Sequence, residues 1–256
     1  QPCYGKHSEV QNLPIYSNLV SLAKVHEAKP EDRVLELSIG NGVGFKVLNS
    51  VTEAKVYGGD LSPNMVKAAK ARNPLNKENI EVMNNEDLSL FKDGSLRTVI
   101  SGFSLHLVSN PLQMLKETRR VLDKNNKEAS AVFSIWGRPE NNFPFTIIPS
   151  ILKEMGIKLP NERSNFHLST KDVCLSLCKE AGFENIFLEY QSYILNYESV
   201  KDMDFIFQEP DFVVFLESLG VEKAEALKSK VLEAYDKEFK EKKRITLESL
   251  IIQLKN

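Results

Sequence analysis

The sequence has few cysteines and histidines, and this scarcity limits the chemistry it can support. Three cysteines are too few for a disulfide framework. Two of them, Cys174 and Cys178, are spaced four residues apart on a predicted helix, where we interpret them as small buried apolar residues. The four histidines show no metal-ligand spacing, so no metal site is predicted. Free thiols are typical of a reducing, intracellular compartment, and we expect a cytoplasmic location.

Long apolar runs and an excess of charge of either sign are also lacking. A membrane-spanning helix needs about 18 consecutive apolar residues, and no run in the sequence comes near that length, so no membrane span is expected. No signal-peptide pattern is found at the start of the sequence. The 33 lysines and arginines nearly balance the 35 acidic residues, which argues against a nucleic-acid partner. The first residue is Gln1 rather than Met, which leaves open a missing or trimmed start. The sequence does not indicate an oligomeric state.

The most informative stretch is residues 34–44, which read VLELSIGNGVG. A short apolar run that breaks into glycines is typical of a strand buried in a parallel sheet. The next residues have helical character, so backbone N–H groups and a helix N-terminus meet at the glycine turn. Glycine allows a ligand to approach that backbone closely.

A second strand is predicted over residues 55–60, and Asp60 is its last residue. In a βαβ unit an acid at this position points into the crevice beside the glycine turn and accepts hydrogen bonds from two ribose hydroxyls. The two stretches together predict a site for a nucleoside cofactor. A dinucleotide dehydrogenase is the weaker alternative, because Phe45 stands where that fingerprint needs its third glycine.

The two stretches resemble the motifs of the class I S-adenosylmethionine (SAM)-dependent methyltransferases. The first motif of that family is acid-x-Gly-x-Gly-x-Gly, and it matches with Glu36 as the acid, Ser38 in place of the first glycine, and Gly40 and Gly42 as the others. Residues 59–65, GDLSPNM, resemble the second motif almost residue for residue. The branch that fits best is the small-molecule one, methyltransferase type 11, related to ubiquinone and menaquinone biosynthesis.

The resemblance implies a SAM site with S-adenosylhomocysteine (SAH) as its product. Glu36 would bind the methionyl end through the loop and Asp60 the ribose, while adenine contacts would come from residues after the second and third strands. The cofactor-binding residues that the resemblance implies are Glu36, Ser38, Gly40, Gly42, Asp60, Leu61, Met65, Asn84, Asn85, Glu86, Ser101 and Phe103.

Three positions depart from the family pattern. Ser38 replaces a glycine, and its Cβ would shift the loop or weaken affinity. Asn84 is placed at an acid that contacts adenine; an asparagine amide still donates and accepts hydrogen bonds there, but without charge. Arg97 stands where an acid is common, and the sequence offers no physical account of that exchange.

The candidate residues for the methyl acceptor are fewer. His106 follows the fourth predicted strand, where the family often has a histidine, and it is a candidate general base because histidine titrates near neutral pH. A histidine that only packs there is at least as good an interpretation. Tyr16, Trp136 and Arg138 are further candidates for substrate binding. Tyr16 lies on a predicted helix over 13–28 that either packs on the sheet or covers the crevice.

The alternating pattern predicts an α/β fold: a Rossmann-like, seven-stranded, mostly parallel sheet with flanking helices, an antiparallel closing strand and a helical cap. We expect one methyltransferase domain over residues 1–256. Its core would comprise about 30–137, 169–197 and 245–255, and the cap and insertions about 1–29, 138–168 and 199–243. Aromatic residues cluster in the two insertions, which favours a small, partly hydrophobic substrate. They are Trp136, Phe143, Phe145, Phe166, Phe205, Phe207, Phe212 and Phe215.

The function predicted from these features is methyl transfer from SAM, by in-line displacement, to an oxygen, nitrogen or carbon of a small molecule. Positioning and desolvation can supply most of such catalysis, so the reaction needs no obvious catalytic constellation. Two alternatives stay open: a degenerate member that serves as a binding or regulatory subunit, and a protein methyltransferase.

Overall fold

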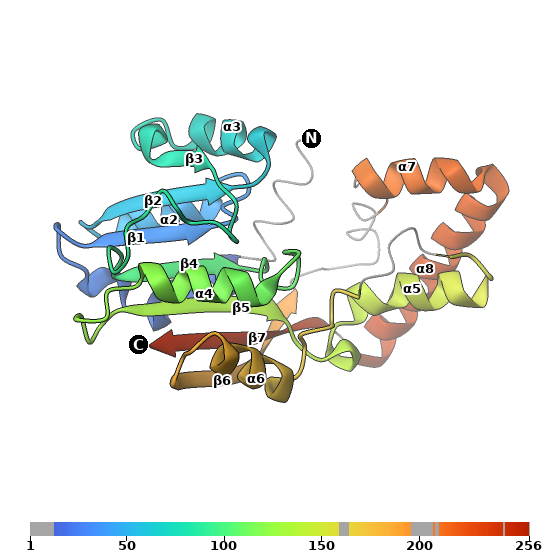
Figure 1. The fold of residues 1–256 in the computed structure, drawn as a ribbon. Helices are drawn as coiled ribbons and strands as arrows, with labels where there is room; N and C mark the ends of the chain where they lie inside the picture. Colours follow the sequence, from blue (N-terminus) through green and yellow to red (C-terminus); the bar gives the residue numbers. More distant parts are fainter. Residues whose placement is uncertain (1–12, 159–163, 196–206, 208–209, 243, 256) are drawn as a thin grey trace.

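The computed structural model describes residues 13–158, 164–195, 207, 210–242 and 244–255. Its centre is a seven-stranded sheet in the order β3-β2-β1-β4-β5-β7-β6 (Figure 1). The strands are β1 (Arg33–Leu37), β2 (Lys55–Asp60), β3 (Ile80–Val82), β4 (Thr98–Gly102), β5 (Ser130–Trp136), β6 (Asn185–Leu195) and β7 (Ile245–Lys255). Strands β1 to β5 pair in parallel, and β7 runs antiparallel to both β5 and β6. The predicted fold class is confirmed.

Helices cover both faces of the sheet, as buried parallel strands require. Helical residues 13–22, α2 (Val43–Val51) and α3 (Pro63–Arg72) share one hydrophobic cluster with β1 and β2. On the opposite face, α4 (Pro111–Val121) and α6 (Lys171–Glu180) pack on β1, β4 and β5. Every residue of β5 is buried, which explains its continuous apolar run.

Three short 3-10 helices complete the connections: η1 (Val25–Glu27), η2 (Lys77–Asn79) and η3 (Pro139–Asn141). The helix predicted over 13–28 is helical only to residue 22, and η1 follows it. The end of the strand predicted over 185–197, and the first part of the helical stretch predicted from 199, lie outside the described residues.

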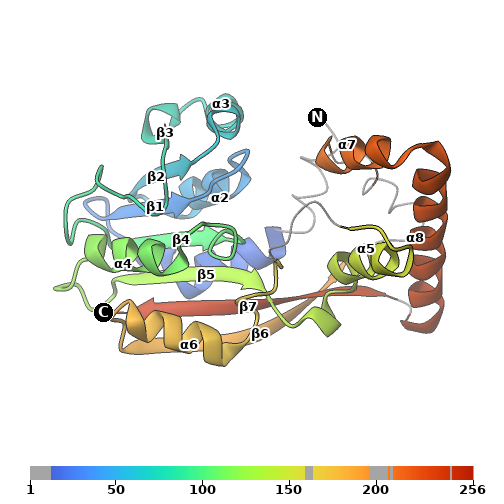
Figure 2. The same ribbon diagram turned by 45° about the vertical axis from the view of Figure 1, so that its right-hand side comes forward.

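Three helices lie beyond the carboxyl ends of the parallel strands, and we call them the cap: α5 (Phe143–Glu154), α7 (Pro210–Leu219) and α8 (Val221–Lys242) (Figures 1 and 2). They have a hydrophobic cluster of their own, which includes Leu152, Leu227 and Tyr235 and which reaches Trp136 at the end of β5. The sequence predicts a short helix near residues 147–155, and α5 begins earlier than that, at Phe143, because proline is tolerated in a first helical turn.

The exchange at Arg97 has a structural reason. Its side chain is 4% exposed, and its Nε lies 3.5 Å from Asp32 Oδ2 at the start of β1. Its Nη1 also donates to Thr98 Oγ1 over 3.2 Å. Arg97 therefore lies at the amino-terminal edge of the sheet, where it neutralises a partly buried acid and contacts no ligand crevice.

None of the helices in the described ranges has a stretch long and apolar enough to cross a lipid bilayer. Within those same ranges, no group of three or more histidine, cysteine, aspartate or glutamate side chains is placed to bind a metal ion.

Candidate cofactor site

The glycine loop between β1 and α2 adopts left-handed backbone conformations at three residues. The φ angles are +53° at Ser38, +53° at Gly40 and +80° at Gly42. A Cβ on Gly42 would lie 2.6 Å from Asn73 Nδ2 on the segment after α3, and this amide donates to the Gly42 carbonyl over 3.0 Å. Gly42 is therefore required both for its φ angle and for this close packing.

Asp60 joins the two motifs at the end of β2. Its Oδ2 accepts a hydrogen bond from the Gly40 N–H (3.0 Å), and its Oδ1 accepts one from the Ser62 N–H (2.9 Å). Each carboxylate oxygen has two lone pairs, so each can accept a further bond from a ligand hydroxyl. Asp60 is half-buried, which keeps it within reach of such a ligand.

A cavity of about 230 Å³ opens beside this loop at the carboxyl edge of the sheet. Its walls come from helical residues 13–22, β1 and its loop, the start of α3, and the ends of β4 and β5. The lining residues are Leu13, Ile15, Tyr16, Glu36, Ser38, Ile39, Gly40, Asn41, Val43, Gly44, Met65, Gly102, Phe103 and Ser134. Seven of the predicted site residues therefore meet at one cavity: Tyr16, Glu36, Ser38, Gly40, Met65, Phe103 and, through Gly40, Asp60.

Glu36 and Tyr16 form the most buried polar pair of this cavity. Glu36 is 3% exposed and Tyr16 8% exposed. Burial raises the pKa of Glu36 to about 8; the Tyr16 hydroxyl works to lower it, and the charge of Asp60 raises it further. Burial, and then the Glu36 charge, raise the pKa of Tyr16. Glu36 Oε2 has no hydrogen-bond partner among the described residues, which is costly for a buried carboxylate and marks a position where a ligand donor would bind.

Gly44 shapes this pair, although the motif comparison gave it no role. A Cβ at Gly44 would collide with Glu36 Oε1 and lie 2.5 Å from Tyr16 Cζ. The Tyr16 ring also lies near Gly102, whose added Cβ would be 3.7 Å from Tyr16 Cδ2. The ring thus spans from the glycine loop to the end of β4. In the sequence, Gly44 could have been identified only as the third of three alternate glycines, after Gly40 and Gly42.

The serine that replaces the first motif glycine has a specific partner. Ser38 Oγ accepts a hydrogen bond from Asn85 Nδ2 over 2.8 Å, and Asn85 is 5% exposed. This bond links the glycine loop to the turn after β3 and supports a serine in a left-handed conformation. Asn84 is exposed instead, and its Oδ1 accepts from the Glu86 N–H. The structure therefore brings Asn85, and not Asn84, to the glycine loop.

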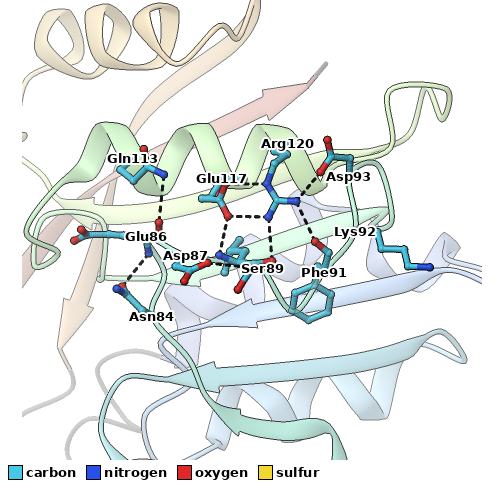
Figure 3. A network of polar contacts seen from close by, with 12 residues as sticks. Asn84, Glu86, Asp87, Ser89, Phe91, Lys92, Asp93, Gln113, Glu117 and Arg120 are labelled. Atoms are coloured by element: carbon cyan, nitrogen blue, oxygen red, sulfur yellow. Dashed lines mark hydrogen bonds and ion pairs between the residues drawn. The ribbon is translucent and has the colours of Figure 1, made fainter.

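The turn after β3 is fixed from the other side by α4 (Figure 3). The Arg120 guanidinium donates to Glu117, to Asp93 and to the carbonyls of Leu88 and Phe91. Glu117 Oε2 also accepts the Leu88 N–H over 2.8 Å. The bonds from Arg120 hold the pKa of the Glu117 carboxyl below its ordinary value.

Glu86, a predicted adenine contact, takes part in the same anchoring. Its Oε1 accepts the Asn110 N–H over 2.9 Å at the start of α4, and its carbonyl accepts from Gln113 Nε2 (Figure 3). Leu61, another predicted adenine contact, is 69% exposed directly after β2. Ser101 is fully buried; its Oγ donates to the Leu37 carbonyl over 3.1 Å and contacts Ser104 Oγ, so it joins β4 to β1 and does not line the cavity.

Three of the residues predicted to contact the methyl acceptor, Trp136, His106 and Arg138, do not line the cavity. Trp136 stacks on the cavity residue Phe103, with ring centroids 4.1 Å apart, and on Phe145 of α5 at 4.3 Å. His106 is 2% exposed, and its ring lies 6.5 Å from that of Trp136; it is not one of the cavity residues. Arg138 makes two hydrogen bonds to the buried Glu248 of β7, of 3.0 and 2.6 Å, and its guanidinium lies over the Tyr190 ring.

Comparison with known proteins finds a family match over the part of the chain that contains the glycine loop and Asp60. Residues 35–127 match the model of a sequence family described as a methyltransferase domain, type 11. The match covers just over a third of the chain, and this part is similar to a methyltransferase domain. This similarity agrees with the predicted enzyme class, a class I methyltransferase that uses SAM as its methyl donor. No curated protein matches the sequence significantly.

Solved structures share the fold at low sequence identity. YcgJ from Bacillus subtilis is 17% identical, with a TM-score of 0.59 over 93% of this chain and 97% of YcgJ. Phosphoethanolamine N-methyltransferase 2 from Haemonchus contortus, solved with phosphomonomethylethanolamine and SAH, is 16% identical with a TM-score of 0.54. That match covers 93% of this chain but only 52% of the nematode enzyme, so the chain spans about half of its length. A geranyl diphosphate methyltransferase solved with SAM is 14% identical, with a TM-score of 0.53 over 94% of this chain and 85% of that enzyme.

Proposed function

We propose that this protein transfers a methyl group from SAM to a small-molecule acceptor bound between the central cavity and the cap. The observation that carries the proposal is the cavity itself, where a tight glycine loop and two acids, Glu36 and Asp60, meet at the carboxyl edge of a parallel sheet. This is the position at which open α/β sheets bind nucleotide-like ligands.

The residues present fit SAM. Glu36 Oε2 is a buried acceptor without a partner, and it suits the ammonium group of the methionyl end. Asp60 retains acceptor capacity for the two ribose hydroxyls, and Gly40, with open space at its Cβ position, leaves room for close approach to the backbone. Asn85, with its buried Oδ1 lacking a partner among the described residues, suits a donor on the adenine edge.

When bound, SAM supplies a methyl group on a sulfonium centre, which an in-line nucleophile can displace. The chain's own contribution is to bind and orient both reactants and to exclude water. Tyr16 and Phe103 enclose the cavity on two sides. Because orientation and desolvation account for much of the rate in such a displacement, a general base is needed only for an acceptor that must lose a proton.

We assign His106 a positioning role in this scheme. It is buried behind the stacked aromatic rings, whereas a base must come within hydrogen-bond reach of the acceptor. The scheme includes the predicted organisation as one methyltransferase domain, with the cap helices α5, α7 and α8 on the acceptor side.

The deciding experiment is calorimetric titration with SAM and SAH of the wild-type protein, Asp60→Ala and the control Asp93→Ala. We expect micromolar binding to the wild type. Loss of two charge-assisted hydrogen bonds should weaken binding to Asp60→Ala by about 100-fold. Asp93 is 81% exposed beside Arg120, and its replacement should leave the affinity unchanged.

If the folded wild-type protein binds neither SAM nor SAH, the enzyme proposal fails and a structural or regulatory role would take its place. If it binds SAM but methylates only protein substrates in a labelled-methyl assay, the small-molecule assignment fails and cofactor binding stands.

A further inference from the structure

Phe103 has an unusual backbone conformation for a bulky residue. Its φ is +53°, in the left-handed region that disfavours side chains with a Cβ. The conformation is held by its N–H, which donates to the Ser134 carbonyl over 2.8 Å and approaches Ser134 Oγ at 3.3 Å. Such strained residues are retained where the surrounding structure fixes them, often at functional sites.

The strained backbone places the Phe103 ring between the cavity and the cap. One face of the ring stacks on Trp136, at an interplanar angle of 27°, and Trp136 in turn packs on Phe145 of α5. Trp136 is only 9% exposed, whereas Phe103 is half-buried and lines the cavity. A molecule bound between the cavity and the cap therefore meets the Phe103 ring.

The charges around the cavity disfavour an anionic molecule. Among the described residues that line it, one is a carboxylate, Glu36, and none is a lysine or arginine. Arg138 just after β5 is paired with Glu248, and Arg97 lies at the opposite edge of the sheet with Asp32. A carboxylate or phosphate on the acceptor would have no lysine or arginine to pair with in the described walls.

We infer that Phe103 determines acceptor specificity, and that the acceptor is an uncharged molecule with a flat apolar face that packs on this ring. The inference rests on the proposed function and deepens it. Packing of a flat apolar surface on an aromatic ring gains burial as well as favourable ring contact.

The test uses Trp136, the only tryptophan in the chain, as a local reporter. The SAH-saturated protein is titrated with N-phenyl-naphthylamine, a neutral apolar probe that accepts energy from tryptophan, and with anilinonaphthalene sulfonate, which carries a sulfonate on the same ring system. We expect the neutral probe to quench Trp136 emission and to bind at least about tenfold more tightly than the sulfonate.

Phe103→Ala should weaken the neutral probe by about tenfold, and Phe103→Leu by less, because leucine keeps apolar contact without the ring. The matched control is Phe187→Ala on β6, where the side chain is 47% exposed. This control variant should bind the neutral probe as tightly as the wild type does. SAH affinity, measured by calorimetry on each variant, sets the SAH concentration that saturates it, and Phe187→Ala should change that affinity by no more than about twofold. Circular dichroism confirms folding, and Phe103→Leu serves if Phe103→Ala unfolds.

Three results would overturn the inference and leave the proposed function intact: sulfonate binding as tight as that of the neutral probe, unchanged binding of the neutral probe in both Phe103 variants, or SAH binding without any quenching of Trp136 by the probe. Absence of SAH binding to the wild type would instead contradict the proposed function itself.

Discussion

The donor half of the molecule, residues 35–127, and the cap form their sites by different means. In the donor half, backbone N–H groups, glycines and two acids meet at the ends of β1 and β2. In the cap, the contacts come from aromatic and aliphatic side chains that form a separate hydrophobic cluster. A backbone-built site needs particular residues at particular positions, whereas a side-chain surface can change while the fold persists. The donor half is accordingly the part that a sequence family describes.

A polar junction connects the two regions. Glu248 on β7 is 3% exposed and accepts bonds from Arg138 and Asn141, which both follow β5. Burial works to raise the pKa of this carboxyl, but its hydrogen bonds with Arg138 and Asn141 outweigh burial and hold it below its ordinary value. The junction fixes the chain where it leaves the sheet for the cap.

The largest effect on the donor half is expected from Gly44→Ala. The new methyl would occupy space now held by Glu36 and Tyr16, so both side chains must shift. We expect SAH affinity to fall by at least about 100-fold, and the free energy of unfolding to fall by about 1–3 kcal/mol from overpacking. Calorimetry measures the SAH affinity, and thermal unfolding measures the loss of stability.

Gly156→Ala is the matched control for that substitution. Gly156 follows α5 in the cap region, at φ +69° with open space around its Cβ position. It should lose about 1 kcal/mol of stability through backbone strain and none of its SAH affinity. Equal SAH binding by Gly44→Ala and wild type would show that the cavity beside Gly44 is not the donor site.

The next largest effect is a pH dependence of stability caused by Glu36. Its pKa is about 8 in the folded protein, against an ordinary value of 4.5 for a glutamate carboxyl, so the folded state binds an extra proton between these pH values. Stability of the ligand-free protein should therefore fall as pH rises from about 5 to 8, by up to about 1.4 kcal/mol per pH unit. Tyr16 and Asp60 are the titratable groups that face Glu36.

Urea unfolding of the wild type and of Glu36→Gln at several pH values measures the contribution of Glu36 to the pH dependence of stability. Glutamine keeps the shape of the side chain without the charge, so the difference between the two proteins should grow in favour of the variant up to pH 8 and then level off. A difference that is independent of pH would mean that Glu36 is ionised throughout this range.

Most of the sheet and the loop that carries the donor site could be predicted from the sequence, because local patterns encode them. Apolar runs mark the parallel strands, and glycines and Asp60 mark the turns that follow β1 and β2. The class of the fold and of the enzyme followed from the same residues. Cap helices were less predictable: Pro144 and Pro149 interrupt the pattern, so the predicted helix near 147–155 missed the first turn of α5.

Contacts between distant segments were beyond the reach of sequence patterns. Ser38 with Asn85, Arg97 with Asp32, and Arg138 with Glu248 are pairs in which each residue alone is ambiguous. Only the fold shows that the Arg138 side chain is hydrogen-bonded to Glu248. These pairs depend on strand order and register, which bring together residues up to 110 positions apart.

The smallest expected effect on SAH binding comes from a substitution in the cap, Leu227→Ala, and it tests whether the two regions act independently. Leu227 on α8 is fully buried in the cap cluster, and Leu227→Ala should lower the free energy of unfolding by about 3 kcal/mol. SAH affinity, measured well below the unfolding midpoint, should change by less than about twofold, because the cavity walls are intact.

Leu115→Ala provides the comparison, because Leu115 is equally buried but lies on α4, which anchors the turn after β3 through Glu117 and Arg120. A similar loss of stability should here be accompanied by weaker SAH binding, by several-fold, since the position of Asn85 depends on that turn. If Leu227→Ala weakened SAH binding as much as Leu115→Ala, the cap would be part of the donor site and the two regions would not recognise their ligands independently.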